Sequence, residues 1–194
     1  MERREALKNI FNLSIAAAVA PLPSFANLSL DESDLLKQNA QSFNKALLTN
    51  PDLQGFVGLK QNISQQTLTI EGKIPADFKG AFYRNGPAIH QRQEQRYTHL
   101  FEGDGMVQQF SFSKLGVTHQ AKFINTDKFV QEQQAGKFLF SGPDSKLKHS
   151  LSITGPDSIN AANINVLPVN GELWALWEAG SATAARELAG APVW

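Results

Sequence analysis

The sequence predicts an all-β fold of antiparallel strands, preceded by a targeting segment and one N-terminal helix. Pairs of short apolar segments with alternating polar residues follow one another from about residue 65 onward. Phe dominates the aromatic residues, with 13 Phe against 2 Tyr and 3 Trp, and many Phe stand at alternate positions that suit a sheet face. Short strands joined by irregular connections are typical of a β-sandwich or a β-propeller.

Residues 1–26 have the organisation of an export signal. Arg3 and Arg4 precede an apolar stretch at 13–20, and Ala26 closes a small-residue sequence of the kind that signal peptidases cleave. Paired arginines before a modest apolar stretch resemble a twin-arginine signal, so a periplasmic location is expected. The alternative is an uncleaved amphipathic N-terminus on a cytoplasmic protein.

Residues 27–64 are predicted to contain a helix and a lead-in to the sheet region. Ser29 and Glu32 have the spacing of a capping box, so the helix is expected to begin there. A single apolar stripe follows, and Asn50-Pro51 ends the helix. The stripe consists of Leu36, Ala40, Phe43 and Leu47.

The next segments change to the period of a β-strand. Alternating apolar residues predict strands at 67–70 and 81–83, and a hairpin that joins 107–112 to 117–124. Gly116, in the link of this hairpin, is expected to adopt a positive φ.

A short helix is predicted between this hairpin and the next. Residues 127–137 have a helical pattern, and either Thr126 or Asp127 can cap it. A polar loop from 141 to 151 follows.

The clearest hairpin joins residues 164–169 to 172–178. Its link is Asn170-Gly171, the dipeptide best suited to a type I′ turn. Pro168 cannot donate to a ladder, so its strand is expected at a sheet edge or beside a bulge.

Composition excludes several function classes. The 18 Lys and Arg residues balance the 18 Asp and Glu residues, so no broad positive field favours nucleic acid. Cysteine is absent, which excludes disulfides, zinc–cysteine sites and thiol catalysis.

Two polar motifs lie close together between the predicted strands. Residues 84–87 predict a turn, and residues 102–105 predict a tight loop in which both glycines adopt a positive φ and the aspartate accepts backbone N–H groups. An ion pair between Arg84 and Asp104 is a hypothesis. Two carboxylates are too few for an EF-hand calcium loop. The motif residues are Arg84, Asn85, Gly86, Pro87, His99, Gly103, Asp104 and Gly105.

Together with later segments, these motifs resemble the carotenoid cleavage oxygenases. The resemblance extends over residues 65–184, and its segments come in the family's order. Glu102 stands where the family has Asp, and Asn125 stands where it has Arg. The segments are 70–80, 82–87, 99–106, 123–129, 163–166 and 173–180.

The resemblance implies the early blades of a seven-bladed β-propeller. It also implies an Fe(II)-dependent dioxygenase that cleaves a conjugated carbon–carbon double bond of a carotenoid, apocarotenoid or stilbene-type substrate with O2 and gives two carbonyl products. In the family, four histidines hold the iron, and a glutamate that matches Glu178 accepts the ring N–H of one of them. The alternative for Glu178 is a solvated carboxylate at a strand end.

The family's iron ligands fall beyond Trp194, so the resemblance assigns no catalytic residue and no metal ligand to this chain. The chain alone is therefore expected to be an inactive N-terminal fragment. Its own four histidines match no ligand positions, and His99 is expected to stabilise the loop at 102–105. They are His90, His99, His119 and His149.

Residues 185–194 depart from the family pattern and are interpreted as a divergent tail, for which a frameshift is one explanation. The resemblance implies a hydrophobic small molecule and O2 as partners, names no protein partner, and leaves a peripheral membrane contact open. The competing function, from a different class, is a small exported β-rich binding module without catalysis.

Overall fold

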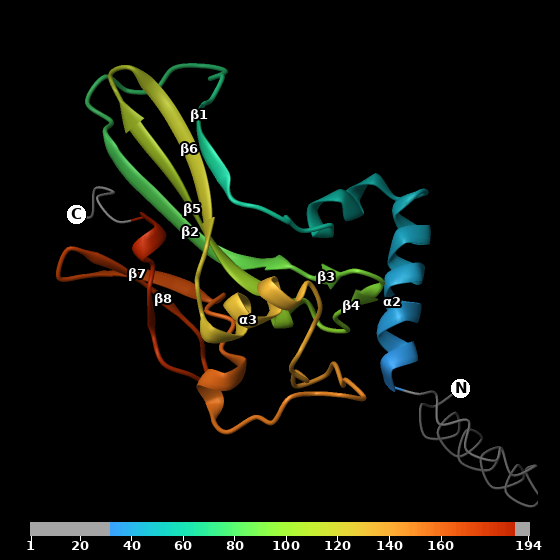
Figure 1. The fold of residues 1–194 in the computed structure, drawn as a ribbon. Coiled ribbons are helices and arrows are strands. Elements are labelled where there is room, and N and C mark those ends of the chain that lie inside the picture. Colours follow the sequence, from blue (N-terminus) through green and yellow to red (C-terminus); the bar gives the residue numbers. More distant parts are fainter. Residues whose placement is uncertain (1–31, 189–194) are drawn as a thin grey trace, which may run out of the picture. The chain divides into compact units, whose positions relative to one another are not determined.

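The computed structural model describes residues 32–188 (Figure 1). The predicted export signal, with Arg3, Arg4 and Ala26, lies outside the described residues, as does Ser29 of the predicted capping box. Most of the regular structure after the first helix is β-strand, in three antiparallel sheets.

The predicted N-terminal helix is present as α2 (Glu32–Leu47). Its apolar stripe faces inward, because Leu36 is 0% and Ala40 is 2% exposed. The helix ends before Asn50, as predicted. The side chain of Asn50 then caps the 3-10 helix η1 (Pro51–Phe56).

Helix α2 is attached to a two-stranded sheet of β3 (Gln91–Arg92) and β4 (Gln95–Arg96). The Asn39 side-chain amide donates to the carbonyl of Tyr97 at 2.5 Å. The Arg96 guanidinium lies 3.5 Å from the centre of the Phe43 ring, which is a close cation–π contact. The helix therefore packs on β4 through one amide and one stacked cation.

A four-stranded sheet forms the centre of the fold, in the order β1-β6-β5-β2. Its strands are β1 (Ile63–Thr67), β2 (Gly80–Ile89), β5 (Asp104–Ser113) and β6 (Gly116–Phe123). The predicted hairpin of β5 and β6 is confirmed. Gly116 has a φ of 118°, the conformation that this turn requires.

The predicted strand at 67–70 is wrong in position, because β1 ends at Thr67. Thr67 pairs with Thr118, and the Leu68 N–H donates to the carbonyl of Val117 at 2.9 Å. Strand β6 begins at Gly116, so the residues after Leu68 have no ladder left to join. The alternating pattern continues past the point where its partner strand ends.

A third sheet contains β7 (Asn165–Val169), β8 (Glu172–Leu176) and β9 (Thr183–Ala184). The hairpin of β7 and β8 is the predicted one. Asn170 and Gly171 have φ values of 51° and 81°, as a type I′ turn needs. Pro168 lies in β7, which is an edge strand, as its missing N–H predicts.

Helix α3 (Asp127–Ala135) confirms the predicted short helix and decides between its two candidate caps. The Thr126 hydroxyl accepts the N–H of Phe129 at 3.1 Å, so Thr126 is the cap. Gly136 ends the helix with a φ of 65°.

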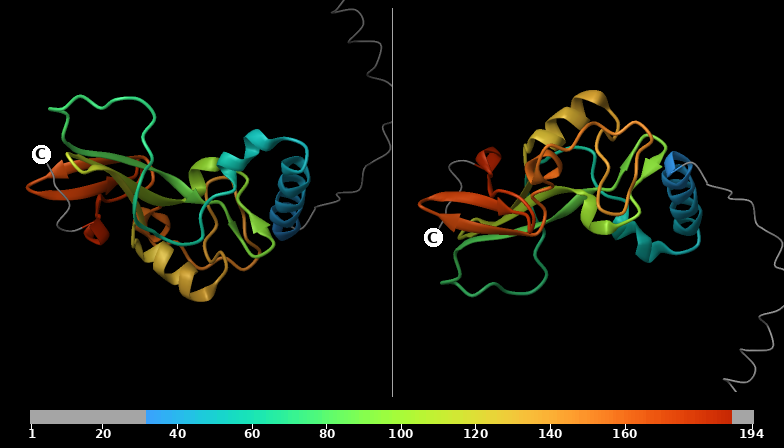
Figure 2. Two further views of the ribbon diagram at one scale, coloured as in Figure 1. Left: turned by 90° about the horizontal axis from the view of Figure 1, so that it is seen from above. Right: turned by 90° about the horizontal axis from the view of Figure 1, so that it is seen from below.

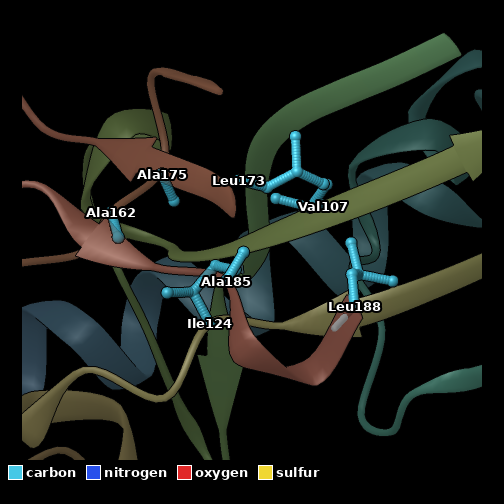
Figure 3. Packing of buried hydrophobic residues seen from close by; sticks show 7 residues of the cluster. All are labelled: Val107, Ile124, Ala162, Leu173, Ala175, Ala185 and Leu188. Atoms are coloured by element: carbon cyan, nitrogen blue, oxygen red, sulfur yellow. The ribbon is translucent and has the colours of Figure 1, made fainter. Parts of the chain in front are cut away.

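The four-stranded and three-stranded sheets lie against each other and enclose one core cluster (Figures 2 and 3). Ala185 and Leu188, from the segment interpreted as a divergent tail, are each 4% exposed and belong to this cluster. These two residues therefore pack as core, whereas Arg186 between them is exposed. The cluster consists of Val107, Ile124, Ala162, Leu173, Ala175, Ala185 and Leu188.

A second cluster lies on the opposite face of the four-stranded sheet, under α3. Phe123 of β6 stacks on Phe129 of α3, with ring centres 5.1 Å apart. Met106 and Ala121 complete the contact beside them. Both faces of this sheet are thus apolar where the three-stranded sheet and α3 cover them.

Candidate functional site

The predicted turn at residues 84–87 is wrong, since these residues lie inside strand β2. Asn85 pairs with Val107, and Gly86 pairs with Met106, along an unbroken ladder to β5. A register shift follows Pro87, which is where a residue without an N–H fits a strand. The Gly-Pro pair here marks an irregular strand.

Asn85 connects the two large sheets. Its side-chain amide donates to the carbonyls of Ala162 at 2.8 Å and Asn165 at 2.9 Å, both of which precede or begin β7. The motif thus fixes the position of one sheet on the other.

The hypothesis of an ion pair between Arg84 and Asp104 is wrong. Arg84 is exposed on β2, whereas Asp104 is 1% exposed and binds two other cations. Arg92 donates to one Asp104 oxygen at 2.8 Å, and Lys128 donates to the other at 2.6 Å. Among residues 32–188, Asp104 accepts none of the backbone N–H groups expected of it, and each of its oxygens binds a buried cation instead.

Four charges form a balanced buried cluster: Asp104, Arg92, Lys128 and Glu132. Lys128 also pairs with Glu132 at 3.0 Å, and Arg92 approaches Glu132 at 3.6 Å. Burial alone would lower the pKa of Lys128, but Asp104, with smaller contributions from Tyr97 and Glu132, raises it well above its usual value. Two cations against two carboxylates leave no net charge in this apolar region.

Gly103 and Gly105 are conformationally ordinary, so the predicted positive φ is wrong for both. The glycines with a positive φ lie elsewhere in the described chain, and Gly103 has a φ of −66°. Both positions require glycine because there is no space for a Cβ atom. A Cβ on Gly103 would lie 2.7 Å from the His90 ring nitrogen, and one on Gly105 would lie 2.7 Å from the Ala161 carbonyl oxygen.

His99 stabilises the start of this loop, as expected. Its ring accepts the Phe101 N–H at 3.2 Å, and Glu102 accepts the His99 N–H at 3.2 Å, which together form a capping box on the 3-10 helix η2 (Leu100–Glu102). The other oxygen of Glu102 accepts the N–H of Ser145 at 2.9 Å. Glu102 therefore also fixes the polar loop at 141–151.

Glu178 lies in the turn that follows β8, and its side chain is exposed. It stands at the rim of two cavities, one of about 170 Å³ and one of about 790 Å³. The smaller is lined by Trp177, Phe101 and Phe140. Among the described residues, Glu178 has no hydrogen-bond or ion-pair partner. Its carboxylate can therefore accept a hydrogen bond from a further group.

His99 caps η2, and His90 and His119 are buried. His119 stacks on Phe110 with ring centres 4.6 Å apart, and His149 is exposed in the polar loop. His90 is 4% exposed; burial, and then the nearby Arg96, lowers its pKa to about 4. Within residues 32–188, no group of three or more His, Cys, Asp or Glu side chains is placed to hold a metal ion.

The helices of the described segment are too short or too polar to cross a membrane. This finding concerns residues 32–188 alone.

A family model described as retinal pigment epithelial membrane protein matches residues 57–186. The chain belongs to this family, the carotenoid cleavage oxygenases. Apocarotenoid-15,15'-oxygenase of Synechocystis is 34% identical over 143 residues, which are 66% of this chain and 27% of that enzyme. Lignostilbene-alpha,beta-dioxygenase isozyme III of Sphingomonas paucimobilis is 32% identical over 132 residues, with the same coverage of 66% and 27%.

Solved structures agree with the family match. A variant of the Synechocystis apocarotenoid oxygenase superposes with a TM-score of 0.57 at 33% identity, and covers 68% of this chain and 28% of its own. Its cobalt-substituted form matches with a TM-score of 0.56, so this relative carries a metal. The all-β prediction is confirmed, with β-propeller oxygenases as structural neighbours. The chain spans about a quarter of the length of these relatives.

Proposed function

We propose that this chain contributes part of the active site of an Fe(II)-dependent dioxygenase that cleaves a conjugated carbon–carbon double bond with O2. The observation that carries the proposal is the free carboxylate of Glu178, next to Trp177 and at the rim of two cavities. Three of the matched Synechocystis structures are substituted at one glutamate or at the tryptophan just before it. Trp177-Glu178 is the one Trp-Glu sequence in this chain.

The described residues do not fit an iron site of their own, because they bring no three ligand side chains together. Iron would supply the activation of O2 when bound, through ligands from outside residues 32–188. In this proposal Glu178 is a positioning residue. Its carboxylate accepts the ring N–H of a histidine and so fixes which ring nitrogen faces the metal.

The substrate proposed is hydrophobic and conjugated: a carotenoid, an apocarotenoid or a stilbene. The cavity beside Glu178 supports this class, because its wall includes the aromatic side chains of Phe101, Phe140 and Trp177. The names of the relatives point the same way, since they include oxygenases of an apocarotenoid, of lignostilbene and of β,β-carotene. The expected products are two carbonyl compounds.

A chimera tests the proposal. Residues 57–186 would replace the matching region of the Synechocystis oxygenase, and apocarotenoid cleavage and bound iron would both be measured. Glu178→Gln should lower the iron affinity or the cleavage rate roughly 10- to 100-fold. Glu172→Gln, an exposed control at the other end of β8, should change neither. Equal iron content and equal rates in the two variants would contradict the proposal.

The second candidate is an exported binding module without catalysis. The large cavity of about 790 Å³, lined by backbone and side chains of β2 and η1, favours it. The chimera distinguishes the two candidates. A chimera that folds but binds no iron and cleaves no apocarotenoid supports the module.

Export to the periplasm through the twin-arginine route is part of the same proposal. It rests on Arg3, Arg4 and the sequence that ends at Ala26. A fusion of residues 1–40 to a reporter that is active only after folded export should reach the periplasm. Export that survives replacement of both arginines by lysine would contradict the twin-arginine route.

A further inference from the structure

Helix α2, the 3-10 helices η1 and η2 and strand β4 border a cleft of about 300 Å³. Figure 1 shows α2 beside β4. This volume lies at the lower end of the range of small-molecule sites. Much of the wall is apolar, and Arg96 of β4 also lines it, so we call this site the Arg96 cleft. Its apolar wall consists of Phe43, Leu53, Phe56 and Leu100.

Arg96 is a buried cation without an anion. It is 6% exposed, and none of the ion pairs among residues 32–188 includes it. One guanidinium nitrogen, Nη2, donates to the carbonyl of Phe56 at 2.6 Å. The other terminal nitrogen, Nη1, is buried and has no hydrogen-bond partner in the described part of the chain. The positive charge and the N–H groups of Nη1 are therefore left without a partner.

Arg92, on the neighbouring strand β3, shows how the same hairpin pairs its other buried arginine. Arg92 is 8% exposed, and its guanidinium donates to Asp104 at 2.8 Å. Within residues 32–188 no carboxylate does the same for Arg96, and burial lowers the pKa of Arg96 below its usual value. A buried charge is costly unless an opposite charge pairs with it. Of these two arginines, Arg96 is therefore the one that an added anion would stabilise.

The wall of the cleft has no group that repels an anion. Among the residues that the structure describes, no Asp or Glu lines it. His90 lines it and is neutral at neutral pH, because burial, and then Arg96, lowers its pKa to about 4. The Nδ1 atom of His90 is buried and, like Nη1 of Arg96, has no partner among residues 32–188. Arg96 is the one Arg or Lys among these lining residues, and it lies among aromatic and aliphatic side chains.

We propose that the Arg96 cleft binds a carboxylic acid with an apolar chain. The carboxylate pairs with the Arg96 guanidinium, whose planar fork of N–H groups fits the two carboxylate oxygens. The chain lies along Phe43 and Leu53, where it removes apolar surface from water. A small inorganic anion lacks that second contribution. The proposal is independent of the proposed dioxygenase activity, since Glu178 does not line this cleft.

Calorimetric titration of the full chain with octanoate at neutral pH tests this proposal. Octanoate should bind at a single site per chain, roughly 10- to 100-fold more tightly than octanol, which has the same chain length but no charge for Arg96. Acetate, which has the charge without the chain, should show no saturable binding. Arg96→Met should reduce the affinity for octanoate to that for octanol.

Leu53→Glu tests the same charge without removing Arg96. It places a carboxylate in the wall of the cleft, at a partly exposed position, and should weaken octanoate binding roughly tenfold or more. Leu48→Glu is the matched control, because Leu48 is 86% exposed and does not line the cleft, and it should not change the affinity. Four results would each overturn the proposal: no binding of octanoate, equal affinity for octanoate and octanol, equal affinity in the two leucine variants, or binding of several octanoates per chain without saturation.

Discussion

Replacing Lys128 by Met should destabilise the fold more than any surface substitution. Lys128 lies 2.6 Å from Asp104 and 3.0 Å from Glu132, and all three side chains are at most 5% exposed. The substitution leaves two buried carboxylates with Arg92 as their one cation. Removing one partner of a buried ion pair costs about 3–5 kcal/mol, so the melting temperature should fall by roughly 10 °C.

Urea unfolding followed by tryptophan fluorescence measures the effect. The midpoint should fall while the slope stays constant, because the surface exposed on unfolding is unchanged. Lys128→Met combined with Glu132→Gln restores charge balance and should recover about 2 kcal/mol of the loss. Lys114→Met, in the exposed β5–β6 turn, should stay within about 0.5 kcal/mol of the parent.

Two results would refute the reasoning. A loss of unfolding free energy below about 1 kcal/mol in Lys128→Met would mean that water solvates Asp104, or that a rearranged cation pairs with it, once Lys128 is removed. The double variant could also lose more unfolding free energy than the two single variants lose together. That result would mean that the geometry of Glu132, and not the charge balance, stabilises the cluster.

Further predictions concern His90, the glycines and Asn85. The pKa of His90 is about 4 in the folded protein and 6.5 in the unfolded chain. The contribution of His90 to stability is therefore fully present above pH 6.5, and about 3 kcal/mol of it is lost as the pH falls to 4. His90→Gln should flatten this pH dependence in acid-unfolding curves. Gly105→Ala should cost roughly 1–3 kcal/mol because its Cβ meets backbone, whereas Gly86→Ala, with open space, should cost little; equal melting temperatures would contradict this. Asn85→Ala should cost about 1–3 kcal/mol by leaving two carbonyls unpaired, and unchanged thermal unfolding would count against that role.

The sequence predicted correctly those elements that depend on the conformational preferences of a few neighbouring residues. The turn at Asn170-Gly171 and the end of α2 before Asn50 depend on backbone preferences of a few residues, and both are confirmed. The strand predicted at 67–70 failed because its limit is set by the start of β6, some fifty positions later in the chain. A strand pattern says where pairing is favourable but not where the partner ends.

The partners of buried charges could not be predicted in the same way. Lys128 and Glu132 have the spacing of a helix-surface pair, which usually stays in solvent. Their burial follows from Asp104 and Arg92, which approach from β5 and β3 only after the fold forms. The one signal in the sequence was the position of Phe129 between them, which places an aromatic side chain near the same helix face.

The motif residues near 84–87 and 102–105 were predicted to form a turn and a tight loop, and the structure shows that they serve the fold through other contacts. Asn85 joins two sheets, Asp104 completes a buried ion cluster, and Gly105 lies where any Cβ would meet backbone. Glu178 has the opposite character, since it is exposed and, among the described residues, unpaired. The buried cluster is neutral, whereas the carboxylate of Glu178 is exposed beside a cavity and is therefore available for a partner. That contrast, together with the family match, is why Glu178 is the residue on which the proposed function depends.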